Sequence, residues 1–171
     1  SAGDDDRLDF RAVTIGLTFV IQNEIGNEVN VSDGSNILML IGGKVETLLG
    51  GSGDDRFQIN SNVFNGIIDG GQGKNTLDYN KYATGRNIQL TGLGSQNGFS
   101  GTEAGIGIFD NIENIIGSTK NDTLIGLNLD SIYWINVAAS GVYESGGRSL
   151  TFASFEYLTA GSGHERLDLS G

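Results

Sequence analysis

The sequence predicts an all-β protein that folds as a parallel β-solenoid (β-helix) of about eight coils. Three observations lead to this prediction. A glycine-rich phrase recurs along the chain, short runs of β-branched and aromatic residues lie between its copies, and no window shows helical periodicity over three turns. The 28 glycines without any proline suit a chain that makes many tight turns. At roughly 21 residues per coil, 171 residues correspond to the eight coils.

The glycine-rich phrase is most complete at residues 50–58, GGSGDDRFQ, which match the nonapeptide G-G-x-G-x-D-x-U-x, where U is a large apolar residue. Four altered copies occupy residues 2–9, 70–78, 117–125 and 160–168. The five copies begin at residues 2, 50, 70, 117 and 160, so the gaps between them are 48, 20, 47 and 43 residues. A coil of roughly 20–24 residues explains each gap as one or two coils.

A longer repeat of about 110 residues is also present. The pattern apolar-Glu-x-apolar comes just before the glycine-rich phrase at residues 45–49, 112–116 and 155–159. Two pairs of segments also correspond, 17–22 with 132–137 and 29–35 with 142–147. We therefore interpret residues 1–171 as one solenoid domain of about one and a half long repeats, in which residues 45–155 form one full repeat.

Short β-prone runs lie between the glycine-rich phrases, at residues 17–21, 37–41, 88–90, 132–137 and 150–152. A strand of this length cannot bury its apolar face alone, whereas equivalent strands stacked about 4.8 Å apart satisfy both the backbone and the side chains. Corners between strands favour residues that tolerate a left-handed backbone. We expect equivalent corners, several with positive φ, at Gly50, Gly51, Gly70, Gly71 and Gly161. We also expect Asp55 to stack on Asn75 of the next coil.

The composition argues against several classes of partner. A net charge of −11 is unfavourable for nucleic acid and for an anionic membrane surface. The chain has no cysteine, which excludes disulfides and thiolate metal sites. No apolar run is long enough to span a bilayer, so we expect no membrane insertion.

The phrases GGSGDDRF, IDGGQGKNTLDY, FDNIENIIGSTKNDTLIG and FASFEYLTAGSGHERLDL together resemble the repeat regions of very large secreted bacterial surface proteins. These are the filamentous-haemagglutinin-like and haemolysin-type (RTX-like) proteins, and the resemblance extends over essentially the whole chain. It implies secretion to the cell surface, a β-solenoid or a calcium β-roll, and a role in adhesion or surface structure. The chain departs from RTX arrays, which run nonapeptides head to tail, because residues 59–67 interrupt the pattern after one copy.

A calcium site is the first candidate for chemistry at the glycine-rich phrase. One nonapeptide supplies backbone carbonyls and one carboxylate, about half of the six to eight oxygen ligands that Ca²⁺ takes. The candidate ligands are the Gly51 and Gly53 carbonyls, Asp54 and Asp55, with Asn75 and Asp122 in the corresponding places of other copies. The alternative is that Gly and Asp only shape the corner through Asx hydrogen bonds.

An enzyme is not predicted. A polysaccharide-cleaving β-helix needs convergent carboxylates in a groove, whereas Asp54, Asp55 and Arg56 are consecutive and send alternate side chains to opposite faces of a strand. The single histidine, His164, has no partner for a triad or a metal cluster. Trp134 is interpreted as a core residue, with a sugar-stacking platform as the alternative.

The sequence therefore predicts a structural or adhesive repeat module of a giant extracellular or cell-surface bacterial protein, without catalytic residues. A calcium-dependent folding or binding module is the alternative, followed by a polysaccharide-binding or polysaccharide-cleaving β-helix. Expected partners are neighbouring repeats or copies that stack end to end on open terminal coils, and a carbohydrate or another cell-surface ligand. The recurrent glutamates Glu46, Glu113 and Glu156 are expected to face solvent, because direct stacking would make them repel.

Overall fold

The structure is a computed structural model that describes residues 6–22, 28–40, 45–61, 64–137 and 139–169. Over these ranges the chain forms strands, turns and loops without a helix, which confirms the all-β prediction there. No helix in the described part of the chain is therefore long and apolar enough to cross a membrane.

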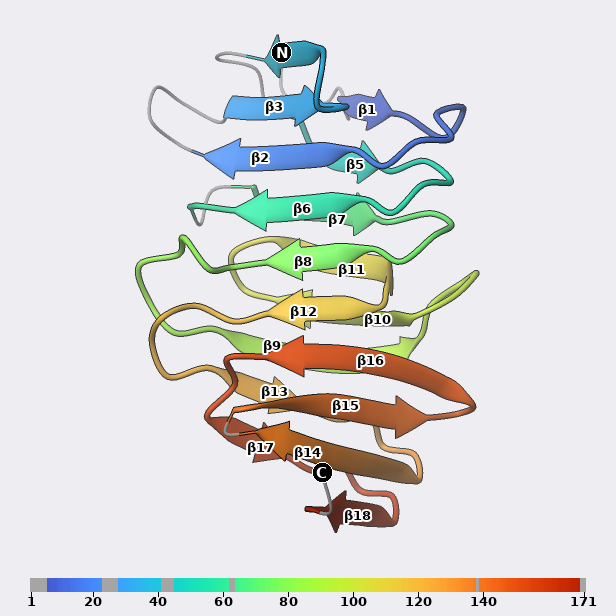
Figure 1. Cartoon of the computed structure of the whole chain (residues 1–171), viewed down its shortest axis with the longest axis vertical. Coiled ribbons are helices and arrows are strands. Elements are labelled where there is room, and N and C mark those ends of the chain that lie inside the picture. The colour runs from blue at the N-terminus through green and yellow to red at the C-terminus, as the bar shows by residue number, and fades with distance from the viewer. Residues whose placement is uncertain (1–5, 23–27, 41–44, 62–63, 138, 170–171) are drawn as a thin grey trace.

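Two sheets face each other across the core (Figure 1). Within the described ranges, sheet A has eight strands in the spatial order β1 (Arg7–Asp9), β5 (Thr47–Leu49), β7 (Gly66–Asp69), β11 (Gly107–Ile112), β10 (Phe99–Glu103), β9 (Asn87–Leu93), β13 (Thr123–Ile125) and β17 (Tyr157–Thr159). Sheet B has ten, in the order β4 (Ile37–Leu40), β3 (Glu28–Ser32), β2 (Thr18–Gln22), β6 (Arg56–Ile59), β8 (Thr76–Asp78), β12 (Asn114–Ile116), β16 (Arg148–Ala153), β15 (Ser140–Ser145), β14 (Ser131–Val137) and β18 (Glu165–Asp168).

The chain winds as a β-solenoid of about four turns, so the predicted fold class is confirmed but the eight coils are not. Sheet-A strands lead through a corner into sheet-B strands, as in β5–β6 and β7–β8, and these strands stack in parallel. In the part of the chain that the structure describes, three antiparallel meanders interrupt the winding, β2–β4, β9–β11 and β14–β16. A meander folds back within one sheet instead of advancing a coil, and it therefore takes up residues that the prediction assigned to coils.

Each meander is inserted in the same way. Its first strand pairs in parallel with a strand that comes later in the chain, as β2 does with β6, β9 with β13, and β14 with β18. The third strands β11 and β16 pair in parallel with the earlier strands β7 and β12. In the first meander the third strand is β4, which is the outermost strand of sheet B in the described structure.

The core consists of the inward side chains of both sheets, which alternate with outward ones along each strand. Phe19 and Phe57 stack at 4.5 Å between ring centroids, and Phe57 lies in register with Leu77 on the next strand. In sheet A, Leu48 is paired with Ile68 in the same way, and all five side chains are fully buried. Burying each such side chain contributes about 1.5–3 kcal/mol, so the stack of inward residues stabilises every coil against its neighbours.

The five glycines that were expected at equivalent corners do lie there, between sheet A and sheet B. The expectation that several have positive φ was wrong, since only Gly71 does, with φ of 77°. The other reason for glycine is the close approach of neighbouring corners. A Cβ atom on Gly51 would lie 2.2 Å from the carbonyl oxygen of Val13, and one on Gly161 would lie 1.9 Å from that of Leu127.

Candidate functional site

The structure brings together five of the six predicted calcium-site residues. Gly51, Gly53, Asp54 and Asp55 form the β5–β6 corner, and Asn75 occupies the same place in the β7–β8 corner stacked on it. Asp122 lies apart from them in the β12–β13 corner, where the chain passes from sheet B to sheet A on the opposite side of the solenoid (Figure 1).

Asp55 is buried, and backbone donors occupy both of its carboxylate oxygens. Leu17 N donates to Oδ1 and Gly51 N donates to Oδ2, each at 2.7 Å. The side chain is only 1% exposed, and this burial raises its pKa, while the two hydrogen bonds act in the opposite direction. The carboxylate therefore joins its own turn to the preceding coil.

Asp55, Asn75 and Glu113 form a hydrogen-bonded series that we name the corner ladder. Asp55 N donates to Asn75 Oδ1 at 3.1 Å, which confirms the predicted stacking of these two residues. Asn75 N donates in turn to Glu113 Oε2 at 2.6 Å. Each member lies directly before a sheet-B strand, so the ladder links three successive coils along one corner.

The same arrangement recurs before the strands of sheet A. Asp122 Oδ1 accepts from Arg86 N at 2.6 Å, and Asp122 N donates to Glu156 Oε2 at 2.8 Å. Asp6 N donates to Glu46 Oε2 at 2.9 Å. Glu156 is exposed, as expected, whereas Glu46 and Glu113 are only partly exposed. All three glutamates also accept a backbone hydrogen bond from the preceding coil, a role that the expectation did not include. Their place directly before a strand, shared with Asp55, was the sequence signal for this role.

Asparagine replaces aspartate in the second coil for a local reason. Asn75 Nδ2 donates to the carbonyl oxygens of Gln72 and Asn111 at 3.1 and 3.0 Å. At the equivalent point of the first corner, Asp55 instead accepts from Gly51 N. The corner around Asn75 thus offers carbonyl acceptors, which suit an amide, whereas the corner around Asp55 offers N–H donors, which suit a carboxylate.

Two other predicted calcium ligands, Asp54 and the Gly51 carbonyl, also accept hydrogen bonds from backbone N–H groups. Asp54 Oδ1 accepts from Lys74 N at 2.8 Å, and the Gly51 carbonyl accepts from Gln72 N at 3.1 Å. In the part of the chain that the structure describes, no three His, Cys, Asp or Glu side chains gather into a group that could hold a metal ion. Calcium binding at these residues stays a prediction.

The melting temperature in calcium and in chelator shows whether Asp55 is a calcium ligand or only shapes the corner through hydrogen bonds. We expect the same melting temperature for the wild-type chain in both, because backbone N–H groups already occupy the Asp55 oxygens. Asp55→Asn places an amide donor against Leu17 N or Gly51 N and is expected to lower stability by about 1–3 kcal/mol in either condition. Thermal unfolding of both proteins measures this. A calcium-dependent rise in wild type that the variant loses would instead establish the calcium site.

Glu113 gives the corner ladder a pH dependence. Burial raises the pKa of its carboxyl group to about 7, from an ordinary value of 4.5. The folded protein thus holds this proton more tightly than the unfolded chain does, so stability falls as pH rises from about 4.5 to about 7. We expect a loss of about 1–2 kcal/mol once partial solvent exposure is allowed for. Urea unfolding between pH 5 and 8 should show this slope in wild type and a flatter one in Glu113→Gln.

Sequence reasoning missed a buried ion pair between Arg86 and Glu103. Their side chains are in direct contact and the residues are only 9% and 4% exposed. The Arg86 guanidinium lies 4.1 Å from the ring centroid of Tyr82, and Glu103 Oε2 accepts from Gly105 N at 2.8 Å. The two residues lie 17 positions apart around the β9–β10 hairpin, and no motif in the sequence connects them.

Trp134 and His164 lie on the outside of the solenoid. Tyr133 is the buried aromatic residue of this strand, whereas Trp134 is only partly buried, so the interpretation of Trp134 as core was wrong. The Trp134 indole donates to Glu144 Oε2 at 2.8 Å, and the Arg166 guanidinium lies 5.1 Å from its ring centroid. His164 is exposed and contacts Asp130 at 3.3 Å.

An apolar hollow lies at the C-terminal end, where the space between the sheets opens. It has a volume of about 440 Å³ and is lined mainly by Tyr133, Phe152, Phe155, Leu158 and Leu167. These are the inward side chains of the last coils, so the hollow is the open end of the core. Comparison of the chain with protein-family models, curated proteins and solved structures finds no match.

Proposed function

We propose that the chain is a structural repeat module of a giant extracellular or cell-surface bacterial protein, in which stacked coils build a rigid rod. The observation that carries the proposal is the corner ladder, in which Asp55, Asn75 and Glu113 join successive coils along the long axis. In solenoids, stability is approximately a sum of interactions between neighbouring coils. Such a module can be repeated to any length without a new core, which suits a surface stalk.

The resemblance of the glycine-rich phrases to surface-protein repeats supports the extracellular placement, and the net charge of −11 supports solubility outside the cell. Adhesion to a carbohydrate or another cell-surface ligand belongs to the same proposal as a role of the assembled rod.

Surface labelling of the source bacterium tests the proposal. An antibody against the folded chain should label intact cells, and protease added to intact cells should remove that signal. An antibody against a cytoplasmic protein serves as the control and should label only permeabilised cells. Labelling of this chain that also requires permeabilisation would refute the surface role.

A further inference from the structure

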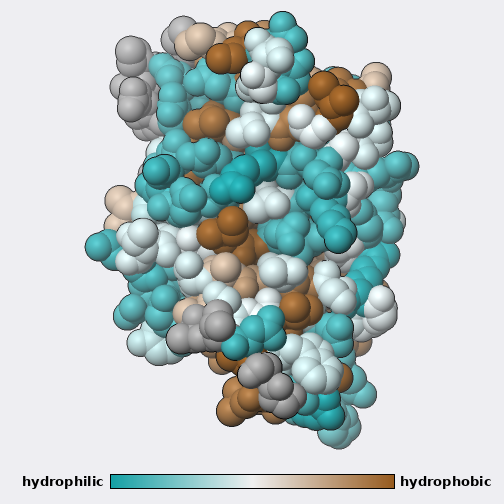
Figure 2. Space-filling view, in the orientation of Figure 1, coloured by the Kyte–Doolittle hydropathy of each residue, from teal (hydrophilic) through white to brown (hydrophobic). Residues whose placement is uncertain are grey.

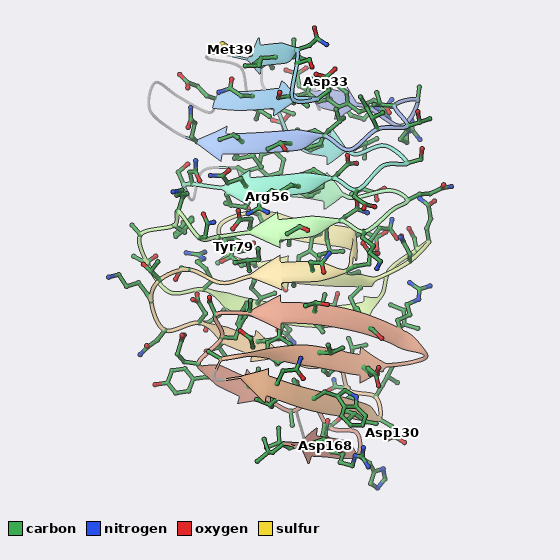
Figure 3. All side chains as sticks on the ribbon, viewed as in Figure 1. Asp33, Met39, Arg56, Tyr79, Asp130 and Asp168 are labelled. Carbon is green, nitrogen blue, oxygen red and sulfur yellow. The ribbon has the colours of Figure 1, made fainter. Side chains whose placement is uncertain are left out.

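The two ends of the solenoid expose side chains that are buried in every interior coil. At one end Leu38 of β4 points inward but is 45% exposed, and at the other end Leu167 of β18 points inward but is 60% exposed. Figure 3 shows the two ends by the labels Met39 at the top and Asp168 at the bottom. Hydrophobic side chains are also visible at both ends of the face in Figure 2.

The long repeat identifies which interior strands correspond to those at the ends. The C-terminal strands β17 and β18 repeat β5 and β6, because each pair follows a sheet-B meander and leads through a glycine-rich corner. At the N-terminal end, β1 and β4 correspond in the same way to β13 and β16. The inward residue Leu167 therefore corresponds to Phe57, which is fully buried.

The C-terminal end lacks the strands that cover its interior equivalents. The strand β5 is covered by β7, with Leu48 opposite Ile68, and β6 is covered by β8, with Phe57 opposite Leu77. Arg56 on β6 also pairs with Asp78 on β8 at 2.5 Å. Its counterpart on β18 is Arg166, which would meet an aspartate of the same kind on a strand that resembles β8.

The N-terminal end likewise lacks the strand that covers its interior equivalent. The strand β13 is covered by β9, and Arg86 N, directly before β9, donates to Asp122. Asp6 corresponds to Asp122, since each donates its N–H to a recurrent glutamate, Glu46 or Glu156. Among the described residues no backbone N–H of a covering strand donates to the Asp6 carboxylate, whereas the Asp122 carboxylate accepts from Arg86 N in addition to Ser118 of its own corner. A strand that resembles β9 would supply that donor.

We propose that each end of this chain binds the part of a neighbouring repeat that is equivalent to β7–β12, residues 66–116 here. Strands like β7 and β8 would extend β17 and β18, and strands like β9 and β12 would extend β1 and β4 of the next repeat. The inference rests on the proposed function of the chain as a repeat module, and it identifies the segment that this module binds.

The strand numbers favour this segment over a second copy of the chain. Joining β18 to β4 of another copy leaves sheet A two strands short of sheet B, since the described residues form ten strands in sheet B and eight in sheet A. The β7–β12 segment contributes four strands to sheet A and two to sheet B. Adding it gives both sheets the same number of strands.

An extended chain tests the proposal. It consists of residues 1–169 followed directly by a second copy of residues 60–171, so that β18 leads into a new β7–β12 segment as β6 does. In the original chain Leu167→Asp should lower the melting temperature by less than about 2 °C, because Leu167 is 60% exposed. In the extended chain the same substitution buries a charge and should lower it by about 10 °C. Ile37→Asp, at the unextended end and 68% exposed, should have the same small effect in both chains.

An equally small effect of Leu167→Asp in both chains would overturn the inference, as would an extended chain whose added part stays unfolded by circular dichroism. Sedimentation of the original chain gives a second measurement. The inference expects monomers, whereas end-to-end oligomers abolished by Leu167→Asp would identify a second copy as the partner instead. None of these outcomes depends on the surface labelling, so failure of the inference and failure of the proposed function are distinguishable.

Discussion

Replacing Glu103 by alanine is expected to lower the free energy of unfolding by about 3–5 kcal/mol. The substitution leaves the Arg86 guanidinium buried without its carboxylate, and it also removes the acceptor for Gly105 N. Without Glu103, the guanidinium keeps only the Tyr82 ring at 4.1 Å and a long contact with Thr84 Oγ1 at 3.5 Å, and its Nε has no hydrogen-bond partner among the described residues. Urea unfolding at pH 7 measures the loss.

Two further variants show whether burial of the charge is the cause. Arg11→Ala breaks the exposed contact between Arg11 and Asp9, which is 2.6 Å long, and should change stability by no more than about 1 kcal/mol. The double variant Arg86→Met with Glu103→Leu removes both charges together and should recover much of the stability lost in Glu103→Ala. Equal losses in Arg11→Ala and Glu103→Ala would show that the buried pair has no special importance.

The second large effect is expected from Gly51→Val, which should destabilise the fold by about 3 kcal/mol or more. The first side-chain carbon would lie 2.2 Å from the Val13 carbonyl oxygen and 3.1 Å from that of Phe10. Both are backbone atoms of the stacked neighbouring corner, so relief requires the two coils to separate. Separation would also break the hydrogen bond from Ser52 N to the Val13 carbonyl, now 2.9 Å long.

Two control variants distinguish the two reasons for glycine, which are the close approach of neighbouring backbone atoms and a positive φ. Ser52→Ala changes an exposed side chain in the same corner and should leave the melting temperature nearly unchanged. Gly147→Ala meets no atom within 4 Å but has φ of 75°, so only backbone strain of about 1–2 kcal/mol is expected. Thermal unfolding of Gly51→Val, Ser52→Ala and Gly147→Ala measures how strongly each substitution destabilises the fold. A melting temperature for Gly51→Val equal to that of Ser52→Ala would contradict the close stacking of corners.

Local patterns in the sequence were sufficient to predict the parts of the structure that depend on neighbouring residues. The short β-prone runs became strands, for example β14 at Ser131–Val137, and the glycine-rich phrases became corners. The pairing of Asp55 with Asn75 was predictable because both occupy the same place in copies 20 residues apart. Each of these features repeats within one coil, so the spacing of residues along the chain carries it.

The tertiary structure alone decided how far the chain advances between strands. A run such as β9 can start a new coil or a meander, and both options bury the same alternate side chains. The number of turns and the place of Asp122 on the opposite side of the solenoid follow from that choice. The Arg86–Glu103 pair likewise depends on the β9–β10 hairpin, which brings two distant charges together in the core. Residue spacing determines local conformation, whereas these features depend on which strands pair, and strand pairing is fixed by packing across the whole molecule.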